Sequence, residues 1–147
     1  MELVVTYKGE EKALHIHDKD IISFPSGLVG FQEWRRFVLL DDPEEAPLAV
    51  LQCVDDTDVS FLVTDPRHIF SDYKLELPLE EADQLGIESA EDGRVLCILT
   101  VKDGPVRVTA NLLGPVVINT RTMIARQVIL QDSQYSAQHP VLVAQAE

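Results

Sequence analysis

Short runs of alternating apolar and polar residues cover most of this chain. Strands that bury one face show this alternation, because successive side chains point to opposite faces of a sheet. About ten such runs, rich in Val, Ile, Leu and Thr, occupy residues 2–7, 12–17, 36–40, 48–54, 60–64, 73–77, 94–102, 106–113, 115–120 and 126–131. Because closing a sheet removes exposed edges, the pattern predicts an all-β fold, an antiparallel β-barrel-like structure or roll of about ten short strands.

One or two short helices complete the predicted fold. The segment PLEEADQLG, residues 78–86, has a proline at its start, acids in its first turn and a glycine stop, with Leu79, Ala82 and Leu85 on one stripe. KGEE (8–11) and KDGP (102–105) have the composition of hairpin turns. No linker divides the chain, so we expect one domain over residues 1–140 and a mobile tail over 141–147.

The glycine-rich stretch FPSGLVGF, residues 24–31, raises the question of a ligand-binding loop. A phosphate-binding loop needs main-chain donors at a helix start and commonly a lysine, whereas Glu33 follows this stretch and no lysine does. We therefore expect a turn in which Gly27 and Gly30 adopt positive φ angles and Phe24 and Phe31 fold back onto the barrel wall.

The composition indicates a folded, acidic protein. The 147 residues carry 25 acids and 12 bases, a formal net charge of −13. This excess disfavours direct binding to nucleic acid and would attract a basic protein partner, although it also serves simple solubility. The N-terminal segment resembles no signal peptide, and the apolar run 108–120 is too short to span a bilayer. We expect a soluble, cytoplasmic protein that does not enter a membrane.

No constellation of residues predicts catalysis, a cofactor or a metal. His15 and His17 would share one face of a strand, but two ligands make a weak metal site and the other histidines are remote in sequence. No serine lies in a nucleophile elbow, and Cys53 and Cys97 lie in apolar segments typical of buried, reduced thiols. We expect a protein that is not an enzyme.

An acidic turn and a nearby aromatic segment are the candidate partner-binding residues. They are Asp55, Asp56 and Asp58 in VDDTD, and Phe70 and Tyr73 in RHIFSDY. An acidic rim around aromatic anchors is typical of protein interfaces. The alternative is a solvated loop beside aromatic residues of the core.

Several motifs in a fixed order resemble one known family. They are DIISFPSGLVGF, FVLL, LQCVDDTDVSFLVTDP, FSDYKLEL, EADQLGI, NLLGPVVINT, RQVIL and YSAQHP, which together run from about Leu3 to Pro140. The chain resembles the FliW family of bacterial flagellar assembly factors. It departs from the family pattern at Arg67 and His68, where relatives often carry apolar or aromatic residues, and this departure bears on partner preference.

The resemblance implies a β-barrel-like protein without catalytic residues that regulates flagellin synthesis. FliW-like proteins bind flagellin in the cytoplasm. When flagellin has been exported they bind the translational regulator CsrA instead and relieve its repression of flagellin translation. CsrA-type proteins are basic, so the charge of −13 suits this partner. We expect a monomer when no partner is bound. The alternative function is a small-ligand-binding or hydrolytic β-barrel protein.

Overall fold

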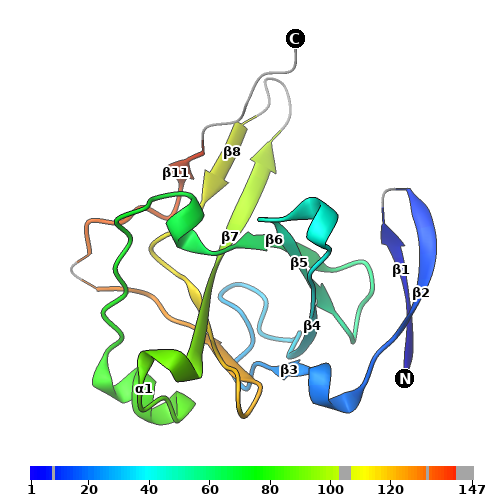
Figure 1. Cartoon of the computed structure of the whole chain (residues 1–147), viewed down its shortest axis with the longest axis horizontal. Coiled ribbons are helices and arrows are strands. Elements are labelled where there is room, and N and C mark those ends of the chain that lie inside the picture. The colour runs from blue at the N-terminus through cyan, green and yellow to red at the C-terminus, as the bar shows by residue number, and fades with distance from the viewer. Residues whose placement is uncertain (8, 103–106, 132, 142–147) are drawn as a thin grey trace.

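The fold is a β-barrel with a separate hairpin and one short α-helix (Figure 1). The computed structural model describes residues 1–7, 9–102, 107–131 and 133–141. The strands are β1 (Glu2–Tyr7), β2 (Glu10–His15), β3 (Ile22–Ser23), β4 (Arg36–Leu40), β5 (Ala49–Cys53), β6 (Ser60–Thr64), β7 (Gly93–Lys102), β8 (Arg107–Ala110), β9 (Val116–Asn119), β10 (Ile124–Gln127) and β11 (His139–Pro140). The helices are α1 (Leu79–Leu85) and the single 3₁₀ turns η1 (Asp18–Asp20), η2 (Pro43–Glu45), η3 (Pro66–His68) and η4 (Ala90–Asp92).

The long strand β7 closes the barrel. The pairing order runs β7, β6, β5, β4, β3, β10, β9 and returns to β7, because the first part of β7 pairs with β9 and the middle pairs with β6. All of these pairs are antiparallel except β3 with β10. The far end of β7 leaves the barrel with β8, and β11 pairs with β8 in turn. The predicted all-β barrel is confirmed.

Three apolar clusters hold these elements together. The barrel interior centres on Phe24 and Phe37, which are fully buried and meet edge to face with ring centroids 5.2 Å apart. A second cluster, around Leu112 and Val117, lies beneath α1 and the segments beside it. The third joins the β1–β2 hairpin, at the right of Figure 1, to the barrel through Leu3. Burying one such side chain contributes about 1.5–3 kcal/mol, so these clusters supply most of the stability.

The two glycines of the turn at residues 24–31 have the predicted positive φ angles, but Phe24 does not fold back onto the barrel wall as predicted. Gly27 and Gly30 have φ angles of +65° and +84°. Phe24 points into the core, whereas Phe31 is 40% exposed and stacks on Trp34 outside it. Phe31 also meets Phe61 edge to face, so it does lie against the barrel wall.

Some local predictions need correction. The predicted helix exists, and Gly86 ends it at a φ of +69°, but Leu79 is 78% exposed and does not belong to the buried stripe. The predicted strand 73–77 pairs with no other strand in the described part of the chain. Residues 103–106, which include the predicted Asp103–Gly104 turn, and the tail residues 142–147 lie outside the described residues.

Candidate functional site

The acidic turn, residues 55–58, follows β5 and is held rigidly. Within it, the Asp56 carboxylate accepts a hydrogen bond from the main-chain N–H of Asp58 at 3.1 Å. Beneath it, the buried side chain of Gln52 donates to the carbonyls of Cys53, Thr57 and Val59 at 3.1–3.2 Å. Aspartate favours such turns because its side chain bonds the main chain two residues on. These bonds hold the main chain of the turn against the end of β5.

An arginine partly neutralises this turn. Arg36 on β4 donates from Nε to Asp55 at 3.0 Å and forms an ion pair with it. The hydrogen bond and the charge of Asp55 raise the pKa of the Arg36 guanidinium, which stays ionised in any case. Asp58 is exposed and Asp56 half-buried, and neither forms an ion pair with any described residue. These two carry the net charge of the turn.

The predicted aromatic anchors lie in different environments. Tyr73 is 7% exposed, its hydroxyl donates to the Leu112 carbonyl at 2.8 Å, and burial raises its pKa. Tyr73 is therefore an aromatic residue of the core, as in the alternative interpretation, and does not offer its ring to a partner. Phe70 is half-buried and meets Tyr135 and His139 edge to face, with ring centroids 6.1 and 6.0 Å away. Tyr73 in turn packs on Tyr135 at 4.4 Å, so it supports this aromatic cluster from the core.

The acidic turn and the aromatic cluster remain separate features. Among the described residues, no hydrogen bond, ion pair or ring contact joins Asp55, Asp56 or Asp58 to Phe70 or Tyr73. No such contact therefore joins the acids and the aromatic residues into a single acidic rim around aromatic anchors. Each feature must be considered as a contact surface by itself.

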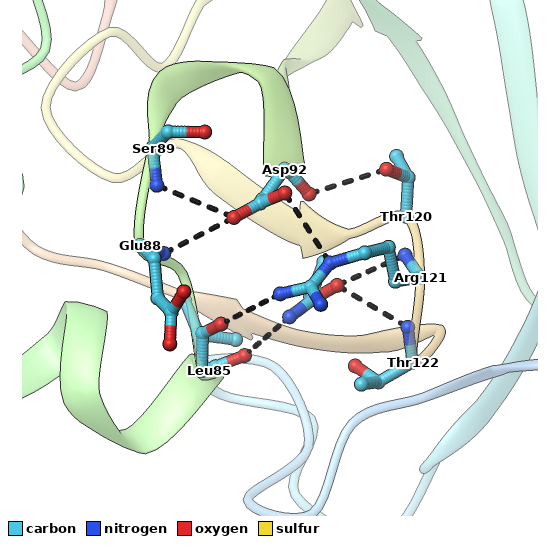
Figure 2. Close-up of polar contacts among 9 residues, drawn as sticks. Leu85, Glu88, Ser89, Asp92, Thr120, Arg121 and Thr122 are labelled. Carbon is cyan, nitrogen blue, oxygen red and sulfur yellow. Dashed lines mark hydrogen bonds and ion pairs between the residues drawn. The ribbon is translucent and has the colours of Figure 1, made fainter.

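A polar cluster ties α1 and η4 to the β9–β10 hairpin (Figure 2). The Asp92 carboxylate accepts from the main-chain N–H groups of Glu88 and Ser89, both at 3.2 Å, and pairs with Arg121 at 3.2 Å. The fully buried Asn119 donates to the Leu85 carbonyl at 2.7 Å. Every buried polar side-chain atom in the described part of the chain has a partner, so this cluster is a structural clamp.

Asn119 also fixes the tight turn that follows β9. Its side-chain oxygen accepts from the N–H groups of Arg121 at 2.9 Å and Thr122 at 3.2 Å. Met123 closes this turn at a positive φ of 58°. An Asn side chain that bonds the main chain two and three residues on is the usual means of stabilising such a turn.

The remaining candidate side chains show no arrangement for chemistry. His15 and His17 meet edge to face with ring centroids 4.9 Å apart, and no group of three His, Cys, Asp or Glu residues that could hold a metal exists among the described residues. Cys53 and Cys97 are free and fully buried, as expected. Burial raises the pKa of Cys97 to about 12, so its nucleophilic thiolate form is scarce at neutral pH.

Three polar residues that support the acidic turn or the clamp were not identified from the sequence. Gln52 and Asn119 occupy apolar strands, where an isolated polar residue is a weak signal for a buried hydrogen-bonding role. Asp92 belongs to a run of surface acids, and the one signal that distinguishes it is the Ser89-x-x-Asp92 spacing of a capping box, which the structure forms. No α-helix in the described ranges is long and apolar enough to cross a membrane.

Comparisons with known proteins agree with the architecture. A family model described as FliW protein matches residues 6–142. The flagellar assembly factor FliW of Bacillus licheniformis is 40% identical over 141 residues, which cover 96% of each chain. That of Bacillus subtilis is 38% identical over 135 residues, 92% of each chain. A crystal structure of the flagellar assembly factor FliW superimposes with a TM-score of 0.85 at 33% identity and covers 97% of this chain and 98% of that one.

Proposed function

The chain belongs to the FliW family of flagellar assembly factors, and on that premise we propose that it is a non-enzymatic, cytoplasmic regulator that exchanges two protein partners. It binds flagellin while flagellin is present in the cytoplasm. When flagellin has been exported, it binds the translational regulator CsrA and relieves the repression of flagellin translation. Abundance of free flagellin thereby controls the synthesis of new flagellin.

The acidic turn is the observation that supports CsrA as a partner. It presents two carboxylates, Asp56 and Asp58, that form no ion pair with any described residue, on a chain of net charge −13. Opposite charges steer two proteins together and raise the association rate more than the final affinity. A basic RNA-binding protein is attracted to such a surface, and the same surface repels the phosphates of RNA.

Flagellin binding is supported by the aromatic cluster. Phe70 offers a partly accessible ring against apolar side chains of a partner. Tyr73, which is buried, supports Tyr135 beneath that ring and does not itself reach the surface. Half-buried aromatic rings supported by a packed core are typical interface anchors, since little side-chain entropy remains to be lost on binding.

A charge variant tests the CsrA part of the proposal. Asp55→Asn, Asp56→Asn and Asp58→Ser together remove three negative charges, and Asn at position 56 can still accept the hydrogen bond of the turn. We expect association with CsrA to slow about fivefold at low salt, with a weaker dependence on ionic strength. Stopped-flow fluorescence at several salt concentrations measures both quantities.

A matched variant controls for overall charge. Asp18→Asn, Asp20→Asn and Glu33→Gln also remove three charges, from exposed residues with no ion pair to any described residue. This control should slow association less than the acidic-turn variant does. If the acidic-turn variant associates as fast as the parent at low salt, or slows no more than the control, the acidic turn is only a solvated loop and its assignment to CsrA is refuted.

A further inference from the structure

A groove of about 930 Å³ runs between the segment that leads into α1 and the segment that follows β10. Both segments lie at the left of Figure 1, the first in green and the second in orange. Phe70, Pro78, Glu80 and Tyr135 are among the residues that line it. Its position differs from that of the acidic turn, none of whose residues lines it.

One wall of the groove is an extended segment without a strand partner. Burial alternates along residues 73–78 as it does along a β-strand, with Lys74 and Glu76 exposed and Leu75 and Leu77 packed inward. No main-chain group of residues 75–77 has a hydrogen-bonding partner in the described part of the chain. Such an extended segment has a free main-chain edge, which can pair with another chain as the edge of a sheet does.

The free edge faces the groove. The Lys74 N–H donates to the Tyr135 hydroxyl at 2.8 Å, so this N–H points toward the groove residue Tyr135. In an extended chain, the main-chain groups of residues two apart point to the same edge. The N–H and C=O of Glu76 therefore point the same way, without a partner among the described residues.

The opposite wall offers an apolar contact. Val128 and Leu130 donate their N–H groups to Pro115 and Leu113, which leaves the main chain of Ile129 on the other edge. The Ile129 side chain lines the groove and is 48% exposed. A large apolar side chain half exposed beside a free edge is a feature that a bound peptide would cover.

The charges along the groove select the occupant. Asp72, Glu76 and Glu80 line it, and none forms an ion pair with any described residue. Glu81 also lines it, but its carboxylate is held by Arg126 at 2.7 Å. Lys74 is the one cation among the described lining residues. The groove thus favours cationic side chains.

We propose that this groove binds an extended segment of a partner protein in which basic and apolar residues alternate. The segment pairs with the free main-chain groups of Glu76, places its basic side chains against the three acids and covers Ile129. Main-chain pairing supplies affinity, and the acids and the apolar wall supply specificity. A second copy of this chain is a poor occupant because each copy carries a charge of −13. The inference does not depend on which partners the proposed function names.

A synthetic probe tests the inference on the full chain. The probe is a fluorescein-labelled heptapeptide of alternating Lys and Val with blocked ends, and the control is the same peptide with Glu in place of Lys. We expect the Lys peptide to bind, as followed by fluorescence anisotropy at low salt, and the Glu peptide not to bind. Failure of the Lys peptide to bind at about 1 mM, the limit of weak specific binding, overturns the proposal.

Two protein variants locate the binding. Asp72→Asn, Glu76→Gln and Glu80→Gln together should weaken the probe about tenfold, because its lysines lose three opposite charges. The matched control Asp18→Asn, Asp20→Asn and Glu33→Gln removes the same charge elsewhere and should change the dissociation constant less than about twofold. Equal weakening by both variants would mean that only net charge matters, and the groove assignment would be wrong.

Two N-methylated probes test the strand geometry. Methylation of every second peptide nitrogen blocks one edge of an extended chain, and the two possible sets block opposite edges. We expect one methylated probe to lose about tenfold in affinity while the other binds like the parent. Binding of the parent probe should also slow amide hydrogen exchange at Glu76. Equal binding of both methylated probes, or unchanged exchange at Glu76, refutes strand addition.

Discussion

Replacement of Asn119 by alanine tests whether the clamp of Figure 2 holds α1 against the barrel. The side chain is fully buried and makes one hydrogen bond to Leu85 and two from the turn residues Arg121 and Thr122. Alanine can make none of them. The substitution therefore removes all three bonds together with the packing of the side chain that makes them.

The expected loss in the free energy of unfolding depends on whether water can reach each group that loses its bond to Asn119. Leu85 is 2% exposed, so its carbonyl is left without water, at a cost of about 1–3 kcal/mol. Arg121 and Thr122 are exposed, so water can replace the lost acceptor and each bond costs only about 0.5 kcal/mol. The sum is about 3 kcal/mol. For a domain of this length it lowers Tm by about 6–12 °C.

Differential scanning calorimetry and urea unfolding measure this loss. The control is Thr122→Ala, which removes an exposed side chain with no hydrogen bond to any described residue and should change stability by less than about 0.5 kcal/mol. Circular dichroism should show that both variants keep the fold at 25 °C. If Asn119→Ala melts within about 1 °C of the parent, the hydrogen bonds of Asn119 do not stabilise the clamp and the reasoning is wrong.

Three further predictions concern the turn, the thiols and pH. In urea unfolding, Gly30→Ala should lower the free energy of unfolding by about 1 kcal/mol, because alanine is strained at a positive φ. Gly27→Ala should lower it by about 3 kcal/mol or more, because the added Cβ would also lie 2.6 Å from the Cα of Gln32. Equal losses for the two variants would contradict this. Cys97 should resist a thiol-reactive disulfide reagent until the chain unfolds, and modification of the native protein within minutes would contradict its burial. The hydrogen bond from Arg67 lowers the pKa of Asp65 in the folded protein. This pair therefore stabilises the fold above the unfolded pKa of about 3.9, and the stabilisation disappears as pH falls through the lower folded pKa. Arg67→Ala should lower Tm slightly at pH 7 and not at about pH 2, and a Tm difference independent of pH would exclude the pair as its cause.

Alternation along the chain was sufficient to predict most strands and the class of fold. The runs that became β4, β5, β6 and β7 are short, rich in apolar residues and bounded by polar or turn residues, which made them recognisable. Burial along them does not strictly alternate, since neighbours such as Phe37 and Val38 are both buried. The closure of the barrel was not predictable in detail, because β7 meets β9 and β6 at different points along its length. Such pairing depends on contacts between distant residues, which no local pattern encodes.

Local pattern failed where a segment matches a strand or a helix but lacks its usual neighbours. Residues 73–77 alternate like a strand, yet no strand of the described chain pairs with them. Leu79 lies on the apolar stripe of the predicted helix, yet it begins α1 and stays exposed. Period alone cannot show which element covers a face, so both departures required the three-dimensional structure.

The candidate site was predictable only in part. The acidic turn was evident from its composition, because clustered Asp residues favour turns. Tyr73 was misjudged because its sequence neighbours are polar, while its ring lies against residues 39 and 62 positions away, Leu112 and Tyr135. The support from Gln52 was equally hidden, since its three acceptors become neighbours only when the turn folds back on β5.

Partner exchange is the central claim, and one competition experiment tests it most directly. The protein is loaded with CsrA, flagellin from the same organism is added, and titration calorimetry and size-exclusion chromatography follow the complexes. We expect flagellin to bind at tens of micromolar or tighter, roughly −6 to −7 kcal/mol or stronger, and to release CsrA. Absence of heat and of co-elution with flagellin at that concentration, or flagellin binding that leaves all CsrA bound, would contradict the account.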